Sequence, residues 1–160
     1  MLFRSMNIQS NDLIVDVGAG TGDIANLIQK NYSTASIISI DLNFNMLKRG
    51  KEKVKNKSNQ TFWVNCNAEH LPFQNNTFDK YIISFCLRNI TQIDNVLYEA
   101  IRVLKPGGSF YCLEFSTPIS PFISGIYNFY KSKIIPLIGE RVAKNKKAYK
   151  YLEESINQFP

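Results

Sequence analysis

The sequence predicts an α/β protein with a doubly wound, mainly parallel sheet and helices on both of its faces. Short runs of branched and apolar residues alternate with longer amphipathic segments, which is the pattern of strands joined by crossover helices. A glycine-rich loop also follows the first apolar run, and an aspartate ends the second. Both features are typical of doubly wound sheets, in which the loops at the carboxyl ends of the strands form the ligand site.

Five segments have the composition and length of strands. They are residues 12–17, 36–40, 61–66, 80–87 and 109–115. Residues 22–32, 43–57 and 92–104 have helical spacing of their apolar side chains. In the last of these helices we expect the buried face to consist of Ile93, Val96, Leu97, Ile101 and Leu104. The sequence KPGG, residues 105–108, should end that helix, because proline and glycine do not continue it.

We expect a single domain over residues 1–160, since 160 residues suffice for one hydrophobic core. Its core should comprise residues 12–115. After Phe115 the alternation of strands and helices stops, and residues 116–160 have the aromatic and branched composition of an irregular helical insertion and tail. No apolar run has the length needed to span a bilayer, and the first residues do not resemble a secretory signal.

The chain carries a net charge of +6, much of it in two lysine clusters at residues 48–57 and 144–150. These clusters fit either a solvated helix face and loop or attraction to an anionic surface, of which a membrane is favoured over nucleic acid. Cys66, Cys86 and Cys112 lack CxxC spacing, so we expect no disulfide or metal site. Cys86 and Cys112 should be small core residues in a reducing compartment.

The glycine loop is the first candidate ligand site. In VDVGAGTGD, residues 15–23, the glycines Gly18, Gly20 and Gly22 allow a tight turn and close approach of a ligand to the backbone. Asp41 ends the second strand about twenty residues later, where an acid can accept hydrogen bonds from ribose hydroxyls. The alternative is a plain turn with a capping aspartate.

The flanking acids distinguish between two nucleoside cofactors. The dinucleotide pattern is G-x-G-x-x-G, whereas this loop reads G-A-G-T-G-D, with Asp16 and Asp23 beside it. Carboxylates there would repel a pyrophosphate, but they suit a cofactor with an ammonium and a sulfonium group. The residues therefore favour S-adenosylmethionine over a dinucleotide.

Two further contacts are predicted where later strands end. Asn67, after the third strand, is placed to meet the adenine edge, or it forms an Asx turn. Ser84, near the end of the fourth strand, is placed close to the methionine part of the cofactor, or its hydroxyl is satisfied within the sheet.

Several motifs together resemble those of the ubiquinone/menaquinone biosynthesis C-methyltransferases, which are class I S-adenosylmethionine-dependent methyltransferases with a Rossmann-like fold. The motifs are DVGAGTGD, NAEHLPFQNNTFD, FCLRNIT, RVLKPGG, LEFS and YKYLEESI. The glycine loop and RVLKPGG are common among class I methyltransferases, while LRN with a following threonine and Y-x-Y-L-x-E-S-I are more specific. The resemblance covers about residues 13–160.

The resemblance implies methyl transfer from S-adenosylmethionine to a ring carbon of a polyprenylated benzoquinol or of demethylmenaquinol. The family's cofactor contacts carry over onto Thr21, Asp41, Asn67, Ala68 and Ser84. Together with Asp16, Gly18, Gly20, Gly22 and Leu42, these are the cofactor-binding residues that we predict. Members of the family usually have a helical region before the first strand, and a helix and two strands after the equivalent of Pro160. We therefore expect this fold to be incomplete at both ends.

Arg88 with Asn89 is the candidate catalytic pair, because a guanidinium can hold a developing phenolate or orient a water that takes its proton. The alternative is an arginine that forms a salt bridge at a strand end. Tyr127, Tyr130 and Tyr149 either line a path for the isoprenoid tail or pack on the sheet.

A lipid substrate implies peripheral contact with a membrane. The expected location is the cytoplasm beside the inner membrane, or the mitochondrial matrix side in a eukaryote. A homodimer or a quinone-synthesis complex would be a further partner, whereas nucleic acid is not expected. Two other functions stay open: a class I methyltransferase for a small soluble metabolite, and a non-catalytic cofactor-binding subunit.

Overall fold

The computed structural model describes residues 6–54, 60–115, 151 and 154–156. The chain divides into two compact units, Met1–Leu113 and Glu114–Pro160. In the second unit the described residues include a helical stretch at 154–156. No helix in the described part of the chain has both the length and the hydrophobicity of a membrane-spanning segment.

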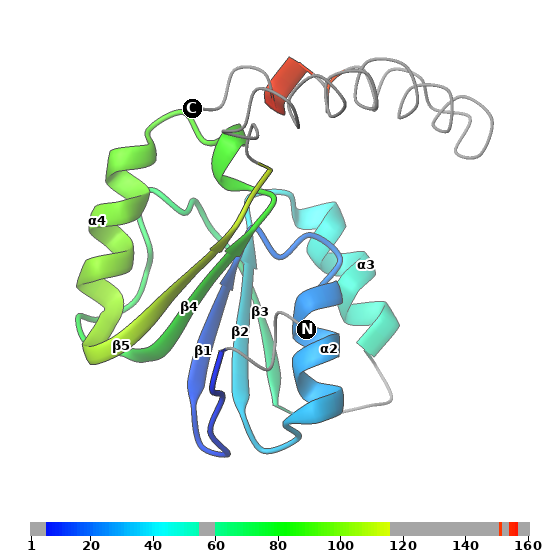
Figure 1. Cartoon of the computed structure of the whole chain (residues 1–160). Helices are drawn as coiled ribbons and strands as arrows, with labels where there is room; N and C mark the ends of the chain where they lie inside the picture. The colour runs from blue at the N-terminus through cyan, green and yellow to red at the C-terminus, as the bar shows by residue number, and fades with distance from the viewer. Residues whose placement is uncertain (1–5, 55–59, 116–150, 152–153, 157–160) are drawn as a thin grey trace, which may run out of the picture. The chain divides into compact units, whose positions relative to one another are not determined.

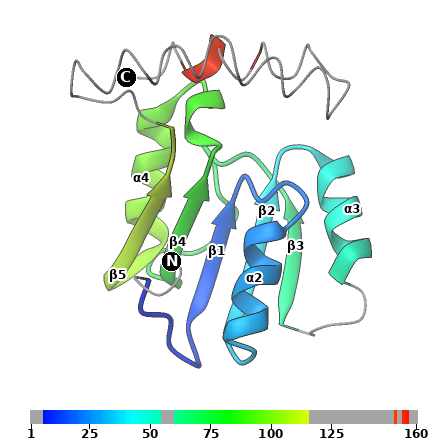
Figure 2. The ribbon, with the colours of Figure 1, turned by 45° about the vertical axis from the view of Figure 1, so that its right-hand side comes forward.

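The first unit contains a parallel sheet of five strands in the order β3-β2-β1-β4-β5. The strands are β1 (Leu13–Val17), β2 (Ser36–Asp41), β3 (Thr61–Asn65), β4 (Phe78–Ser84) and β5 (Leu104–Leu113). All the strands run in the same direction, so their carboxyl ends meet at one edge (Figures 1 and 2). The predicted doubly wound α/β class is confirmed.

Among the described residues, three α-helices connect the strands: α2 (Asp23–Asn31), α3 (Phe44–Val54) and α4 (Ile93–Val103). The chain moves outward from β1 through α2 and α3 in one direction and from β4 through α4 in the other. Because such crossovers are right-handed, α2 and α3 cover one face and α4 covers the opposite face (Figure 2). The winding direction changes between β1 and β4, where ligands bind in sheets of this kind.

Apolar strand residues form the core on the face that α2 covers. Ile14, Ile37 and Ile82 come from three adjacent strands and pack with Ala25 and Ile28 of α2. Leu27 of α2 fits the apolar spacing of the helix, but it is 39% exposed and therefore lies outside this core.

The fourth strand ends earlier than the predicted residue 87. It stops at Ser84, Phe85 has a φ of +53°, and Leu87–Asn89 form the short 3₁₀-helix η1. Phe85 is 41% exposed, whereas Leu87 is buried. The apolar residues therefore extend beyond the end of the strand into a turn. Arg88 lies in η1 instead of at the strand end.

The boundary between α4 and β5 also differs from the prediction. KPGG does follow the helix, but it belongs to β5, which begins at Leu104. The strand accommodates these residues through a positive φ at Gly107 and a register shift in its pairing with Phe78 and Lys80.

The predicted buried face of α4 is partly wrong. The buried residues are Val96, Ala100 and Val103, whereas Leu97 is 37% exposed and Ile101 is 74% exposed. Cys112 is exposed, because it lies on the outermost strand of the sheet, and it is not the core residue that its apolar neighbours suggested.

Candidate functional site

The glycine loop lies between the ends of β2 and β4. On one side, the Ala19 amide donates to the Ile40 carbonyl at 2.9 Å, and the Gly20 amide donates to Asp41 Oδ2 at 2.8 Å. On the other side, a Cβ on Gly18 would lie 2.2 Å from Cys86 Sγ. The loop is therefore in contact with both the predicted ribose-binding acid and the segment that precedes Arg88.

The three loop glycines have positive φ values: +67° at Gly18, +56° at Gly20 and +72° at Gly22. Only glycine adopts this region without strain, so the spacing of the motif sets the path of the backbone. Gly22 also caps α2, with no side-chain hydrogen bond at that cap. No aspartate side chain therefore caps α2, which contradicts the capping part of the alternative.

Asp16 is the most unusual group at this edge. It is 1% exposed, and its Oδ2 has no hydrogen-bond partner among the described residues. Burial, with a smaller contribution from the charge of Asp41, raises the pKa of this carboxyl to about 7. A buried, unpaired carboxylate oxygen is costly unless a donor or cation reaches it, so Asp16 fits a cationic ligand group.

Asp41 has its carboxylate oriented by the backbone on both sides. Its Oδ2 accepts from Gly20, and its Oδ1 accepts from the Asn43 amide at 2.7 Å. The Asn65 side chain of β3 also donates to the main-chain carbonyls of Asp41 and Leu42, at 2.8 and 2.9 Å. Asn65 was missed from the sequence because this role depends on the pairing of β2 with β3.

Thr21 has its hydroxyl directed into a surface cluster. It donates to Asp23 Oδ2 and accepts from Lys53 Nζ, both at 2.9 Å. Leu42, in contrast, is 73% exposed just after β2 and offers an apolar surface beside Asp41. The two predicted contacts thus differ in how freely their side chains can meet a ligand.

Asn67 and Ala68 lie in the loop after β3. The Asn67 Oδ1 accepts the Glu69 amide at 3.0 Å, so the Asx turn is present. The Asn67 side chain is exposed, and its amide nitrogen makes no hydrogen bond to any described residue. The turn and an adenine contact are therefore compatible, since they use different ends of the carboxamide.

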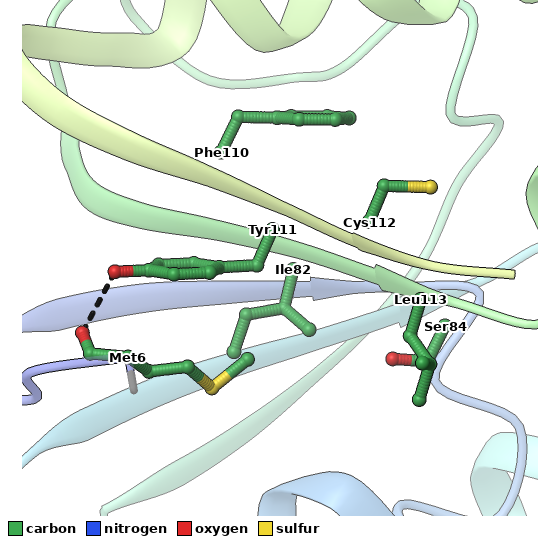
Figure 3. A pocket seen from close by; sticks show the side chains of 7 residues that line it. All are labelled: Met6, Ile82, Ser84, Phe110, Tyr111, Cys112 and Leu113. Carbon is green, nitrogen blue, oxygen red and sulfur yellow. Dashed lines mark hydrogen bonds between the residues drawn. The ribbon is translucent and has the colours of Figure 1, made fainter. Parts of the chain in front are cut away.

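Ser84 is half-buried at the end of β4, where it pairs in register with Leu113 of β5. It lines a hollow of about 210 Å³ with Met6, Ile82, Phe110, Tyr111, Cys112 and Leu113. Figure 3 shows Tyr111 and Leu113 on one side of β5 and Phe110 and Cys112 on the other. The Tyr111 hydroxyl donates to the Met6 carbonyl at 2.8 Å, which holds Met6 at the end of this hollow away from Ser84 (Figure 3).

Arg88 and Asn89 follow β4 in η1 at the same edge of the sheet. The Asn89 amide donates to the Cys86 carbonyl at 2.9 Å, and the Phe85 amide donates to the Leu113 carbonyl at 2.7 Å. Arg88 is half-buried and Asn89 is exposed. The fold thus brings both residues to the edge that carries the glycine loop, while the predicted tyrosines Tyr127, Tyr130 and Tyr149 lie outside the described residues.

No group of three or more His, Cys, Asp or Glu side chains within the described ranges could hold a metal ion.

This sheet order, with a glycine loop after β1 and an acid ending β2, is that of the Rossmann-like folds, which include the class I methyltransferases. Solved structures agree: a putative methyltransferase from Bacillus halodurans matches with a TM-score of 0.69 and 23% identity, over 96% of this chain and 66% of that one. A SAM-dependent methyltransferase from Aquifex aeolicus matches with a TM-score of 0.68 and 20% identity, over 75% and 65% of the two chains. At these identities the likeness shows the fold alone.

Within that class, the chain belongs to the ubiE/COQ5 methyltransferase family, which it matches over residues 1–160. It is 44% identical to the ubiquinone/menaquinone biosynthesis C-methyltransferase UbiE of Bartonella quintana, over 94% of this chain and 59% of that protein. It is 40% identical to the mitochondrial 2-methoxy-6-polyprenyl-1,4-benzoquinol methylase of Gallus gallus, over 100% of this chain and 63% of that protein. The chain spans about three fifths of the length of these relatives.

Proposed function

We propose that this chain forms part of an S-adenosylmethionine-dependent C-methyltransferase that acts on a polyprenylated benzoquinol or demethylmenaquinol. The observation that carries the proposal is the buried Asp16 carboxyl, with its unpaired oxygen beside the glycine loop and Asp41. The names of the relatives, which are C-methyltransferases of ubiquinone and menaquinone synthesis, support the substrate class.

The residues at this edge fit the cofactor. Asp16 would accept the ammonium of its methionine part, whereas a pyrophosphate would meet a buried carboxyl with no compensating cation. Asp41, fixed by two amides, would accept from the ribose hydroxyls. The other proposed contacts are the loop residues Gly18, Gly20, Thr21 and Gly22, the adenine neighbours Leu42, Asn67 and Ala68, and Ser84 beside the methionine part.

S-adenosylmethionine supplies an electrophilic methyl group when it is bound. The task of the chain is then to orient the acceptor ring, to exclude water and to stabilise the negative charge that develops on the quinol oxygen. The Arg88 guanidinium, which stays charged, would hold that oxygen, with Asn89 beside it. A phenolate-like ring is a stronger carbon nucleophile than a neutral quinol, so this contact would act on the chemical step.

A polyprenyl tail requires access from a bilayer. We propose that residues 116–160, with Tyr127, Tyr130 and Tyr149, line the path of the tail, and that this segment and the lysine clusters contact the membrane peripherally. The location would be the cytoplasm beside the inner membrane, or the matrix side in mitochondria, with a homodimer or quinone-synthesis complex as further partners. Co-sedimentation of the full chain with anionic vesicles checks the membrane contact.

Replacement of Arg88 by alanine tests the mechanism. With a quinol analogue as acceptor, Arg88→Ala should lower kcat at least about a hundredfold. Its affinity for the product S-adenosylhomocysteine should stay near that of the unchanged chain, since Arg88 faces the acceptor. Arg49→Ala, which removes an exposed arginine of α3, is the matched control and should leave both quantities unchanged.

Other outcomes would favour the other readings. Turnover that survives in Arg88→Ala would remove this residue from the mechanism. Methylation of soluble phenols in preference to the quinol analogue would indicate a small-metabolite enzyme. Cofactor binding without any turnover would favour a non-catalytic subunit.

A further inference from the structure

The loop between β3 and β4, residues 66–77, carries Asn67 and Ala68 but contains no helix or strand. A segment of this length without secondary structure holds a defined position only if other elements fix it. Here four hydrogen bonds that fix it come from two side chains of α4, Glu99 and Arg102, while the Asn76 and Thr77 amides bond to the main chain at the end of the same helix.

Arg102 binds the loop through a planar network. Its Nη1 donates to the Phe73 carbonyl at 2.7 Å and to Asn75 Oδ1 at 3.0 Å, and its Nη2 donates to the Leu71 carbonyl at 3.0 Å. Its Nε and Nη2 also donate to the two Glu99 oxygens, at 2.7 and 2.8 Å. These bonds engage the whole guanidinium fork, a geometry that a lysine cannot reproduce.

Glu99 binds the same loop, and we call Arg102 and Glu99 together the clamp. Its Oε2 accepts the Leu71 amide at 2.6 Å, so both backbone groups of Leu71 are bound to α4. The hydrogen bond from Arg102 is the largest effect that lowers the pKa of Glu99, so its carboxyl is charged near neutral pH. Leu71 itself is 5% exposed, which anchors its side chain as well.

The residues just before Leu71 are hydrogen-bonded to Asn67, which is one of the predicted adenine contacts. The His70 amide donates to the Asn67 carbonyl at 3.2 Å, and Asn67 forms its turn with Glu69. Glu69 Oε1 accepts the Gln92 amide at 3.2 Å, which ties the loop to the segment between η1 and α4. Asn67 thus makes its hydrogen bonds to Glu69 and His70, and it is linked to α4 indirectly, through the contacts of Glu69 with Gln92 and of Leu71 with Glu99 and Arg102.

The side chains that fix α4 to the sheet are different ones. Val96, Ala100 and Val103 form the buried face of the helix. Lys105, just after it, pairs with Asp79 of β4 at 2.8 Å. Loss of the Arg102 contacts should therefore displace the loop more than the helix.

We propose that Arg102 and Glu99 are positioning residues that hold Asn67 and Ala68 against the adenine ring of the cofactor. This inference rests on the proposed function, because it takes that loop as the adenine site. It predicts that the clamp sets how well the chain distinguishes adenine from another purine. Simple stabilisation of the fold would not change that selectivity in protein that stays folded.

The test compares two ligands with the full chain. S-adenosylhomocysteine carries adenine, and S-inosylhomocysteine replaces the exocyclic amino group of the base with a carbonyl. The unchanged chain should prefer the adenine ligand, and this preference should fall about tenfold in Arg102→Gln and in Glu99→Gln. Arg102→Lys, which keeps the charge but not the fork, should show an intermediate preference.

Lys105→Gln is the matched control, since it removes an ion pair next to the same helix without touching the loop. It should keep the full preference, even if its melting temperature falls. An unchanged preference in folded Arg102→Gln and Glu99→Gln would overturn the inference. If these variants do not fold, Arg102→Lys decides: an undiminished preference there would overturn it too.

The proposed function and this inference fail in different ways. If the unchanged chain bound neither ligand, or did not distinguish between them, the assignment of the adenine site itself would be wrong. If it distinguished between them and the clamp variants did so equally well, only the role of Arg102 and Glu99 would be wrong.

Discussion

Gly18 shows how one residue joins the two halves of the site. Its φ of +67° and its contact with Cys86 both require the absence of a side chain. A Cβ there would lie 2.2 Å from Cys86 Sγ and 2.6 Å from Cys86 Cβ, well inside any real contact. The glycine loop therefore also sets the position of the segment that leads to Arg88.

Gly18→Ala should lower the free energy of unfolding by at least about 2 kcal/mol, because backbone strain and the clash with Cys86 add. It should also weaken binding of S-adenosylhomocysteine. Gly107→Ala is the matched control, since Gly107 has a φ of +82° but nothing within 4 Å of its added Cβ. Its cost should be only the strain of about 1 kcal/mol. Equal costs in urea denaturation would show that the contact with Cys86 contributes nothing.

Asp16 should make the stability of the chain depend on pH. Its pKa is about 7 in the folded state, against an ordinary value of 3.8. Between these values the unfolded state loses the proton while the folded state keeps it, so stability should fall as pH rises from about 4 to about 7 and level off above. The contribution of this one group is on the order of 4 kcal/mol.

Thermal unfolding of the full chain and of Asp16→Asn, from pH 5 to pH 8, measures this effect. The difference in melting temperature between the two proteins should shift in favour of the variant as pH rises, because asparagine has no proton to lose. A difference that stayed constant over this range would mean that Asp16 is not protonated in the folded state.

At the scale of the elements, one aromatic ring packs against the start of α2 and the middle of α3. An added Cβ on Gly22 would lie 2.2 Å from the Trp63 ring, and one on Gly50 would lie 2.6 Å from it. Trp63 of β3 therefore fills the space between the start of α2 and the middle of α3. This explains a glycine in a helix interior, where alanine would otherwise be favoured by about 1 kcal/mol.

Gly50→Ala should accordingly destabilise the chain by about 1–3 kcal/mol, in spite of its better helix propensity. In a Trp63→Leu background the cost should shrink but not vanish, since the Thr21 carbonyl also lies 2.9 Å from the added Cβ. Urea denaturation of the four proteins of this cycle gives the coupling between the two sites. A stabilising Gly50→Ala in the unchanged background would contradict the packing seen here.

The same scale shows what the sequence could predict of the fold. Helical and strand periodicity located the five strands and three α-helices that the structure describes in the first unit, because each buries one face in a regular core. The errors lie at the ends of β4 and β5, where apolar residues continue into η1 and where KPGG enters a strand through a bulge. The composition of these segments does not indicate where the strands end, because that depends on how they pair with a neighbouring strand.

In the candidate site, residues that belong to a sequence motif could be predicted, whereas residues that act through contacts between distant segments could not. The positions of Gly18, Gly20, Gly22 and Asp41 at one edge of the sheet could be predicted from the sequence, because backbone geometry and strand ends restrict the residue types that fit there. Asn65, Glu99 and Arg102 carry no motif that distinguishes them from other polar residues of a strand or an amphipathic helix. Their roles arise from residues that lie 23 to 31 positions away in the chain.

At the scale of the first unit, the two ends of the parallel sheet have different tasks. The carboxyl ends carry the glycine loop, Asp41 and η1, whereas the amino ends carry a buried ion pair between Lys80 of β4 and Asp12 just before β1. The two charged atoms lie 3.3 Å apart, and both residues are 8% exposed. The Gln9 amide also donates to Asp12 Oδ2, at 2.8 Å.

This separation predicts that stability and ligand binding can be changed independently. Asp12→Asn would leave the Lys80 ammonium buried without its counter-ion, so it should cost about 2–4 kcal/mol of stability. Its affinity for S-adenosylhomocysteine should not change, because Asp12 lies at the opposite end of the strands from the proposed cofactor site. Asp41→Asn should mainly weaken ligand binding, since asparagine lacks the charge that favours the ribose hydroxyls. It keeps an acceptor for only one of the two amides that orient the carboxylate, so it should also cost about 1 kcal/mol of stability. Thermal unfolding and calorimetric titration of both variants measure the two effects, and a loss of affinity in folded Asp12→Asn would show that the amino ends of the strands also determine the shape of the site.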